Sequence, residues 1–355
     1  MTNKAVSLKE LRKHRLFMPI VCLIVVLLIN LIKTPNFFAV SINHGVLYGY
    51  IIDVINRGSE LAILAIGMTL VASSSGGTDI SVGAIAAVCA AVITNILSGG
   101  TDSVNEFHAP FLLAIIAGLL VAVLCGMWNG FLVASLKIQP MVATLILYTA
   151  GRGIAQLITR GQITYIRVDA YKVLGSTIGK NPVPTPIYVA IFMIIIASLF
   201  LRYTAFGLYV QTVGINAKAA RLVGLNPVKI QFITYMICGL MAGIAGVIYS
   251  SRIYSCDANN IGLNVEMDAI LAVALGGNSL AGGRFSLPGS LIGAYTIQAL
   301  TTSLYAMGVS ADQLPVYKAI VVVIIVALQS PELYKMLRKK AGAQKKTVIK
   351  EVTQA

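Results

Sequence analysis

An aspartate, Asp79, follows a glycine pair in the segment Ser73-Ser-Ser-Gly-Gly-Thr-Asp-Ile-Ser-Val-Gly83, between two apolar stretches of the chain. An ionised aspartate in the middle of a membrane costs roughly 2.5–3.5 kcal/mol, so this carboxylate needs a cavity or a hydrogen-bonding partner. Thr78 and Ser81 lie beside it and could donate hydrogen bonds. Two interpretations are open: Asp79 lines a cavity, or it is the N-cap of a helix that begins at Ile80. Both hold if the capped helix end is also a cavity wall.

Further polar side chains lie within long apolar stretches, where they either line a polar path or form hydrogen bonds between helices. They are Asn129, Thr144, Arg152, Gln156, Asp268 and Gln298. Arg152 is the least suited to a dry interface, and we expect water or a carboxylate beside it.

The residue types needed for covalent, metal or nucleotide chemistry are not grouped in this sequence. The five cysteines have no C-x-x-C spacing, and the three histidines are scattered. The segment Gly175-Ser-Thr-Ile-Gly-Lys180 lacks the glycine spacing of a phosphate-binding loop, and Asn181 follows where serine or threonine is needed. We therefore predict no catalytic residues, no metal site and no cofactor. If transport is uphill, another subunit supplies the energy.

Apolar stretches of about 20 residues, the length that crosses a bilayer, recur along the chain. Of 355 residues, 57% are hydrophobic and 11% are charged, whereas roughly a quarter are charged in soluble domains. The predicted fold class is all-α, a polytopic membrane protein with about ten transmembrane helices. The predicted spans are Phe17–Ile32, Leu61–Ser74, Ile80–Leu97, Phe111–Ser135, Met141–Ile158, Ile187–Leu201, Ile230–Tyr249, Met267–Leu280, Leu287–Met307 and Val316–Leu328. Leu61–Ser74 and Met267–Leu280 are short for a bilayer.

The charged residues predict how the chain is oriented. The net charge of +14 is concentrated in the tails and some short loops, which follows the positive-inside rule and argues against a nucleic-acid partner. We predict a basic N-terminal tail (1–16), a transmembrane domain (17–329) and a basic C-terminal tail (330–355), with both tails in the cytoplasm. The predicted outer loops hold the acidic residues Asp102, Glu106, Asp257, Glu266 and Asp312. The outer loop Thr159–Pro186 is a basic exception.

Two glycine pairs interrupt the apolar pattern at corresponding places in the two halves of the chain. The aligned residues are Gly76, Gly77 and Gly83 in the first half and Gly276, Gly277 and Gly283 in the second. Glycine-interrupted apolar segments in such places predict weakly repeated halves with two broken or short helices near a translocation path. Two ordinary loops that share glycines by chance would give the same pattern.

The segment Arg202–Lys229 is the longest basic, polar interruption in the second half of the chain. Within it, Asn216-Ala-Lys-Ala-Ala-Arg-Leu-Val-Gly224 predicts a short helix, because alanine favours helix, Gly224 ends it and Pro227 cannot continue it. This helix is either a docking surface for a soluble cytoplasmic partner or part of a solvated loop.

Four segments together resemble the permease subunits of bacterial ABC sugar importers of the ribose, galactose and galactofuranose type. They are Gly76-Gly-Thr-Asp-Ile-Ser-Val-Gly83, Lys137-Ile-Gln-Pro-Met-Val-Ala-Thr-Leu145, Asn216–Gly224 and Asp268-Ala-Ile-Leu-Ala-Val-Ala-Leu-Gly-Gly277. The resemblance covers about Ile52 to Gln329, and Ile51–Gly58 is most similar to the galactofuranose branch. It implies a ten-span permease of the bacterial inner membrane that is not itself an enzyme. It also implies three partners: a cytoplasmic ABC ATPase subunit, a periplasmic sugar-binding protein and a second permease copy or paralogue.

The resemblance also implies roles for particular residues. The helix that couples the permease (17–329) to its ATPase would comprise Asn216, Lys218, Ala219, Ala220, Arg221 and Gly224, within the cytoplasmic coupling loop 202–229. In the resulting alternating-access hypothesis, a furanose, hexose or pentose passes Asp79, Ser81, Asn129, Thr144, Asp268 and Asn278. The alternatives are an ABC permease for a nucleoside or other small polar solute, an ATPase-independent secondary carrier or channel, and a membrane scaffold without a transport path.

Overall fold

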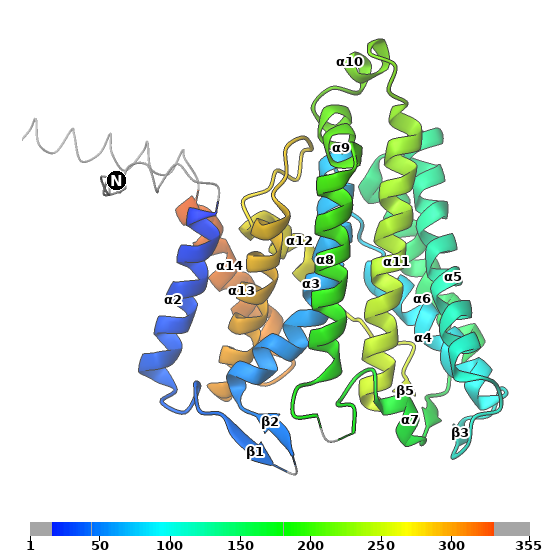
Figure 1. Cartoon of the computed structure of the whole chain (residues 1–355), viewed down its shortest axis with the longest axis vertical. Helices are drawn as coiled ribbons and strands as arrows, with labels where there is room; N and C mark the ends of the chain where they lie inside the picture. The colour runs from blue at the N-terminus through cyan, green and yellow to red at the C-terminus, as the bar shows by residue number, and fades with distance from the viewer. Residues whose placement is uncertain (1–15, 44, 180, 330–355) are drawn as a thin grey trace, which may run out of the picture.

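The computed structural model describes residues 16–43, 45–179 and 181–329, which are mainly helical (Figure 1). The helices are α2 (Phe17–Lys33), α3 (Tyr50–Ser75), α4 (Val82–Ser98), α5 (Phe111–Gly130), the π-helical turn η1 (Phe131–Ser135), α6 (Pro140–Ile158), α7 (Asp169–Lys172), α8 (Thr185–Tyr203), α9 (Phe206–Ile215), α10 (Ala217–Leu222), α11 (Pro227–Ile253), α12 (Val265–Leu275), α13 (Leu287–Ala306) and α14 (Leu314–Gln329). Each of the ten predicted spans overlaps at least one of these helices, and Phe111–Ser135 covers both α5 and η1. The predicted basic tails lie outside the described residues, apart from Leu16.

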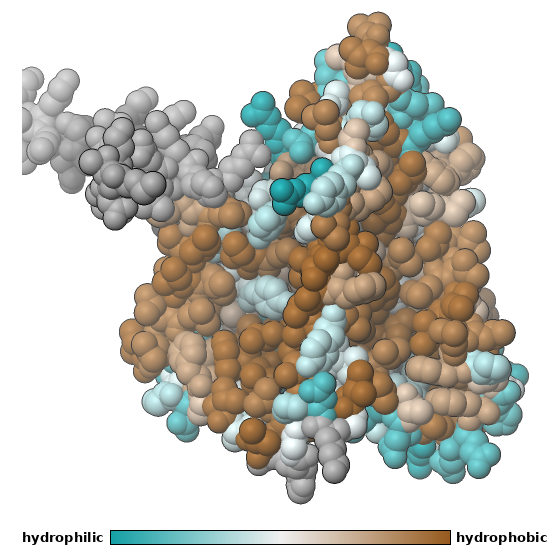
Figure 2. Space-filling view, in the orientation of Figure 1, coloured by the Kyte–Doolittle hydropathy of each residue, from teal (hydrophilic) through white to brown (hydrophobic). Residues whose placement is uncertain are grey.

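Two long helices, α3 and α11, form the centre of the bundle. Of the residues in the most apolar part of each helix, 83% are buried in α3 and 61% in α11, but only 28% in α6 and 17% in α8. Among the described residues, five helices are long and apolar enough to cross a membrane, and several other apolar helices are shorter. Figure 2 shows apolar surface around the middle of one face and hydrophilic surface toward its two ends. The chain is therefore a helical polytopic membrane protein, as predicted.

Small residues allow α11 to pack closely against its neighbours. A Cβ atom on Gly239 of α11 would lie 2.8 Å from Cα of Gly126 in α5. A Cβ atom on Gly67 of α3 would lie 2.8 Å from Cα of Cys238. Such contacts leave no room for side chains, so the helix backbones approach one another as in small-residue interfaces of membrane proteins.

The two predicted short spans have wrong bounds. The short span Leu61–Ser74 is the second part of α3, which begins at Tyr50 and has 26 residues. The first turns of α3 are charged, which lowers their hydropathy, yet Glu60 is buried because it forms an ion pair with Arg252 of α11. Helix α12 is short as predicted, with 11 residues, but it ends at Leu275 instead of Leu280.

Loops from one end of the bundle are joined by a small sheet. Its strands are β3 (Ser103–Val104), β4 (Thr164–Ile166) and β5 (Ser255–Cys256), with β3 parallel and β5 antiparallel to β4. The hairpin β1 (Ser41–Asn43) and β2 (Val46–Tyr48) lies at the same end in Figure 1, and α10 lies at the opposite end. Because each strand of the sheet comes from a different predicted outer loop, these three loops do lie on one side of the molecule. Glu266, also predicted in an outer loop, is instead buried in the first turn of α12.

Candidate functional site

A closely packed polar cluster joins Asp79 and Ser81, in the stretch between α3 and α4, to Asn129 of α5 and Thr144 of α6. Asp79 Oδ1 accepts hydrogen bonds from the backbone N–H of Ser81 at 2.9 Å and from its hydroxyl at 2.6 Å. Asn129 Nδ2 donates to Ser81 Oγ at 2.8 Å, and Thr144 Oγ1 accepts the backbone N–H of Ile80 at 3.2 Å. All four residues are fully buried. The structure thus brings together four of the six predicted path residues, inside the protein and not at an open surface.

The predicted helix start at Ile80, with Asp79 as its N-cap, is wrong. Helix α4 begins at Val82, and its N-cap Ser81 makes no capping bond with its side chain. The hydroxyl of Ser81 is instead engaged by Asp79. Asp79 still satisfies one backbone donor just ahead of the helix, while its other contacts are with side chains.

The two glycine-containing breaks, residues 76–81 and 276–286, are in direct contact. The backbone N–H of Gly283 donates to the carbonyl of Ser73 at 2.9 Å, and the Ser73 hydroxyl donates to the carbonyl of Gly283. A Cβ atom on Gly76 would lie 2.9 Å from the carbonyl oxygen of Ala281. We call these contacts the break junction. They link the two segments that the sequence aligned, although the repeat itself stays a prediction.

The six predicted break glycines meet two different requirements. Three have a left-handed backbone that side chains rarely adopt, and they are Gly76 (φ +64°), Gly277 (φ +76°) and Gly283 (φ +97°). The other three have close neighbours that leave no space for a Cβ atom, and they are Gly77 against Pro140, Gly83 against Glu266, and Gly276 against Gly289. Gly83 is the second residue of α4 and does not belong to a break.

Helix α9 ends on the break junction and leads directly into α10. A Cβ atom on Gly214 would overlap the carbonyl oxygen of Ser73 and lie 2.6 Å from the backbone nitrogen of Gly283. The side chain of Asn216 then caps α10 by accepting the N–H groups of Lys218 and Ala219, each at 3.0 Å. The predicted short helix is therefore confirmed, between Ala217 and Leu222.

Helix α10 has one buried and one exposed side. Ala220 is buried against Val210, Val213 and Ile230, which anchors the helix to α9 and α11. Lys218, Ala219 and Arg221 are exposed, and Gly224 (φ +84°) follows the end of the helix. Leu222 and Val223 are 89% and 73% exposed. This exposed apolar pair was not predicted from the sequence, although Leu222 is two residues from Ala220 and therefore points to the other side of a helix.

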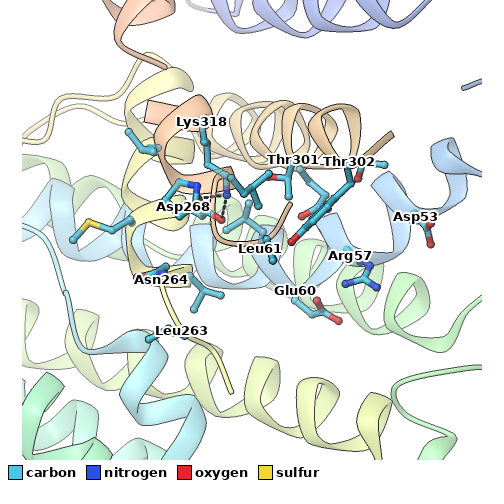
Figure 3. Close-up of a pocket in the computed structure, with 18 of the residues that line it drawn as sticks. Asp53, Arg57, Glu60, Leu61, Leu263, Asn264, Asp268, Thr301, Thr302 and Lys318 are labelled. Carbon is cyan, nitrogen blue, oxygen red and sulfur yellow. Dashed lines mark hydrogen bonds and ion pairs between the residues drawn. The ribbon is translucent and has the colours of Figure 1, made fainter. Parts of the chain in front are cut away.

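A cavity of about 1020 Å³ lies at the opposite end of α11 from α10. It is lined by residues of α3, α11, α12, α13 and α14 and of the loops beside them (Figure 3). Its charged lining residues are Asp53, Arg57, Glu60, Arg252, Asp268 and Lys318, and its tyrosines are Tyr50, Tyr249 and Tyr305. Of the predicted path residues, only Asp268 lines this cavity. The other five charged residues of the lining were not predicted from the sequence as site residues.

Two ion pairs lie on different walls of the cavity. Lys318 Nζ of α14 is 2.9 Å and 2.8 Å from the two carboxylate oxygens of Asp268 in α12. On the other wall, Arg252 pairs with Glu60 and donates to Asn56 Oδ1 at 3.1 Å. Figure 3 shows the Asp268–Lys318 pair apart from Glu60, Arg57 and Asp53, with Leu61 between the two groups.

Asn278, the remaining predicted path residue, lies in neither the polar cluster nor the cavity lining. Its Oδ1 accepts the backbone N–H of Ser286 at 2.6 Å, and its Nδ2 donates to Ser290 Oγ at 2.7 Å. Asn278 therefore holds the second break closed. The six residues predicted to form one path occupy three separate places in this structure.

Arg152 contacts the segment between β5 and α12. Its guanidinium donates to the carbonyl oxygens of Ala258, Ile261 and Gly262 at 3.1, 2.5 and 3.0 Å. The carboxylate expected near Arg152 is that of Glu266, which interacts with the guanidinium electrostatically, while the direct hydrogen-bond partners are backbone carbonyls. An irregular backbone inside an apolar bundle needs such donors, because lipid supplies none. One side chain of α6 thus allows the chain to re-enter the bundle before α12 begins.

These features define a class of protein: a helical membrane bundle with a polar cavity at one end and an exposed basic helix at the other, which is the layout of a transporter's membrane subunit. The sequence profile of the family described as "Branched-chain amino acid transport system / permease component" matches residues 50–328. The chain therefore belongs to this permease family.

Individual relatives support the same assignment. The chain is 43% identical to the galactofuranose transporter permease protein YtfT of Escherichia coli (strain K12), over 90% of this chain and 91% of the relative. It is 37% identical to the fructose import permease protein FruF of Bifidobacterium longum (strain NCC 2705), over 96% of each chain. It is 34% identical to the ribose import permease protein RbsC of Escherichia coli (strain K12), over 88% and 92%. The resemblance to import permeases stated from the sequence is thereby confirmed.

Proposed function

We propose that this chain is the permease subunit of an ATP-driven importer that moves a monosaccharide across the bacterial inner membrane. The observation that carries the proposal is the cavity opposite α10, in a chain whose relatives are named as permeases for sugars. Its volume of about 1020 Å³ is ample for one monosaccharide. Carboxylate, guanidinium, ammonium and hydroxyl groups around it can bond sugar hydroxyls, and tyrosine rings offer apolar faces with a polar tip.

The proposed path runs from this cavity toward the α10 end of the bundle. Asp268 would meet the solute first, since it lines the cavity. The cluster of Asp79, Ser81, Asn129 and Thr144 and the break held by Asn278 are closed by hydrogen bonds in this structure. They would have to separate for the solute to leave. The structure therefore fits a state in which the path is closed at the α10 end.

Energy would come from a separate cytoplasmic ATPase subunit that docks on α10. Leu222 and Val223 form an exposed apolar tip flanked by the basic residues Lys218 and Arg221, and a protein partner would remove this tip from water. Docking of the ATPase on α10 would put both termini in the cytoplasm, in line with their basic residues. A periplasmic sugar-binding protein would then deliver the solute at the end that carries the three-stranded sheet, and a second permease copy or paralogue would complete the transporter.

Movement of α10 would be transmitted through α9 to the break junction. Ala220 fixes α10 to α9, and Gly214 of α9 packs against Ser73 at the end of α3 and Gly283 of the second break without an intervening side chain. A displacement of α10 therefore cannot be absorbed by side-chain rearrangement at Gly214. In alternating access, ATP binding would favour one arrangement of this junction over the other.

Two measurements test the proposal. The chain is purified in mild detergent, and the proteins that remain with it are identified by mass spectrometry. The complex is then reconstituted in liposomes, and uptake of radiolabelled galactose, ribose, fructose and a nucleoside is measured with and without internal ATP. We expect a co-purifying ATPase and ATP-dependent uptake of a sugar.

Uptake by this chain alone that follows an ion gradient would establish a secondary carrier. ATP-dependent uptake of the nucleoside alone would change the substrate class, and no uptake of any solute would favour a scaffold.

A further inference from the structure

We propose that the cavity opposite α10 is a charge filter inside the permease, which holds one neutral polyhydroxylated solute and rejects sugar acids, sugar phosphates and amino sugars. This inference rests on the proposed function, because it concerns the solute that the permease carries. It adds a selecting step within the membrane subunit itself.

The first observation is that the formal charges of the lining cancel. Among the described lining residues, three are acidic and three are basic. The acidic ones are Asp53, Glu60 and Asp268, and the basic ones are Arg57, Arg252 and Lys318. A solute with no net charge enters such a space without a net electrostatic cost. A charged solute loses its hydration and finds no uncompensated charge of opposite sign.

The second observation is that four of the six charged groups are already paired in two ion pairs. Lys318 contacts both carboxylate oxygens of Asp268, so each group compensates the charge of the other and neither presents an uncompensated charge to a solute. Arg252 is held by Glu60 and Asn56. On the exposed side of α3, Asp53 and Arg57 are four residues apart, the spacing at which opposite charges attract along a helix.

The third observation is that the pairs keep hydrogen-bonding capacity for hydroxyl groups. A carboxylate has about four acceptor sites and an ammonium has three donors, so each pair can bond a hydroxyl without being broken. Gln298, Thr301 and Thr302 add uncharged donors and acceptors from α13. Figure 3 shows Thr301 and Thr302 on the same side of the cavity as the Asp268–Lys318 pair. The lining can therefore form hydrogen bonds with a polyol, while its zero net formal charge gives no advantage to a charged solute.

The test uses three sugars that share one ring and differ in charge: galactose, galacturonate and galactosamine. The full-length chain, with the subunits that it retains, is placed in lipid nanodiscs at low salt, and binding is measured by saturation-transfer NMR with millimolar sugar. The pH is chosen so that galacturonate is anionic and galactosamine cationic. We expect the native protein to bind galactose about tenfold or more tightly than either charged sugar, because an uncompensated charge in a partly buried site costs at least this much.

Two substitutions that each remove one charge from the lining should shift the preference among the three sugars in opposite directions. Asp268→Asn leaves the lining with one excess positive charge, so galacturonate binding should rise about tenfold relative to galactose. Lys318→Met leaves one excess negative charge, so galactosamine binding should rise by a similar factor. The double variant is neutral again and should recover the native order. Asp102→Asn, the same chemical change at an exposed residue outside the cavity, should leave the order unchanged.

Several outcomes would overturn the inference: equal binding of all three sugars by the native protein, no binding of any, or the same change for all three in both single variants. If one single variant fails to fold, the other single variant and the double variant decide.

The proposed function is judged separately by ATP-dependent uptake. Uptake of a sugar with no charge preference in the cavity would remove the charge filter and keep the importer. A preference for the neutral sugar in a protein that transports without ATP would keep the charge filter and remove the ATP-driven importer.

Discussion

The guanidinium of Arg152 shows how one side chain can determine a path of the backbone. It serves the carbonyls of Ala258, Ile261 and Gly262, which precede α12 and have no helix or sheet partner to supply a donor. In lipid such carbonyls would have to be satisfied within the protein. Arg152 therefore helps to hold the segment that leads into α12, the helix that carries Asp268 to the cavity.

The first prediction concerns this residue. Arg152→Met keeps an unbranched side chain but removes every donor, and each buried carbonyl left without a partner costs about 1–3 kcal/mol. We expect a clearly lower unfolding temperature in detergent, with Arg152→Lys between the variant and the native protein. Arg167→Met removes an exposed arginine and should change stability by no more than about 0.5 kcal/mol. An unfolding temperature unaffected by Arg152→Met would contradict the proposed role.

At the scale of elements, α9 is the link between the α10 tip and the two breaks. The link depends on Gly214, where a Cβ atom would overlap the carbonyl oxygen of Ser73. Gly214→Ala must push α9 away from the break junction, and overpacking of this kind costs about 1–3 kcal/mol. We expect fewer solute molecules transported per ATP hydrolysed, measured in liposomes, together with a lower unfolding temperature.

A matched substitution distinguishes this effect from a general effect of alanine. Gly153 lies in α6 and has no atom within 4 Å of a built Cβ, so Gly153→Ala should be neutral or slightly stabilising. Transport that stays fully coupled to ATP hydrolysis in Gly214→Ala would show that α9 does not carry the movement.

A third prediction concerns the exposed tip of α10. Leu222→Asp and Val223→Asp place a charge where an apolar pair would be covered by the ATPase subunit, and both side chains are too exposed to affect folding. We expect the ATPase to be lost on purification while the unfolding temperature of the permease stays the same. Ile178→Asp is the control, since Ile178 is 52% exposed but lies in the loop between α7 and α8. Retention of the ATPase by both tip variants would place its docking surface elsewhere.

For the whole molecule, the predicted orientation can be tested with single cysteines. Four of the five native cysteines are buried, which keeps background labelling low. A membrane-impermeant thiol reagent added outside spheroplasts should label Asp102→Cys but not Lys218→Cys, because β3 follows Asp102 at one end of the bundle and α10 contains Lys218 at the other. Inverted vesicles should give the reverse. Labelling of both positions from the same side would refute the two-ended arrangement.

Most of the helices follow from the sequence because apolar runs and glycine or proline breaks are local properties. The start of α3 does not, because hydropathy counts Glu60 as a cost and cannot register its pairing with Arg252, which lies 192 residues away. The same limit applies to the proposed path. Polar residues within spans can be recognised from the sequence, but their assignment to one site requires knowing which helices are neighbours. Asp79 and Asp268 look alike in the sequence, yet one is sealed in a cluster and the other lines the cavity.

The three-stranded sheet has a consequence for the order in which the protein is made. Strand β4 pairs with residues 103–104 on one side and with residues 255–256 on the other, so the sheet is complete only after α11 has been synthesised. Helix α10 precedes α11 in the chain. The α10 tip is therefore synthesised before the three-stranded sheet can join the loops at the opposite end of the bundle. During that interval the tip can already contact a partner, although the fold that positions it is still incomplete.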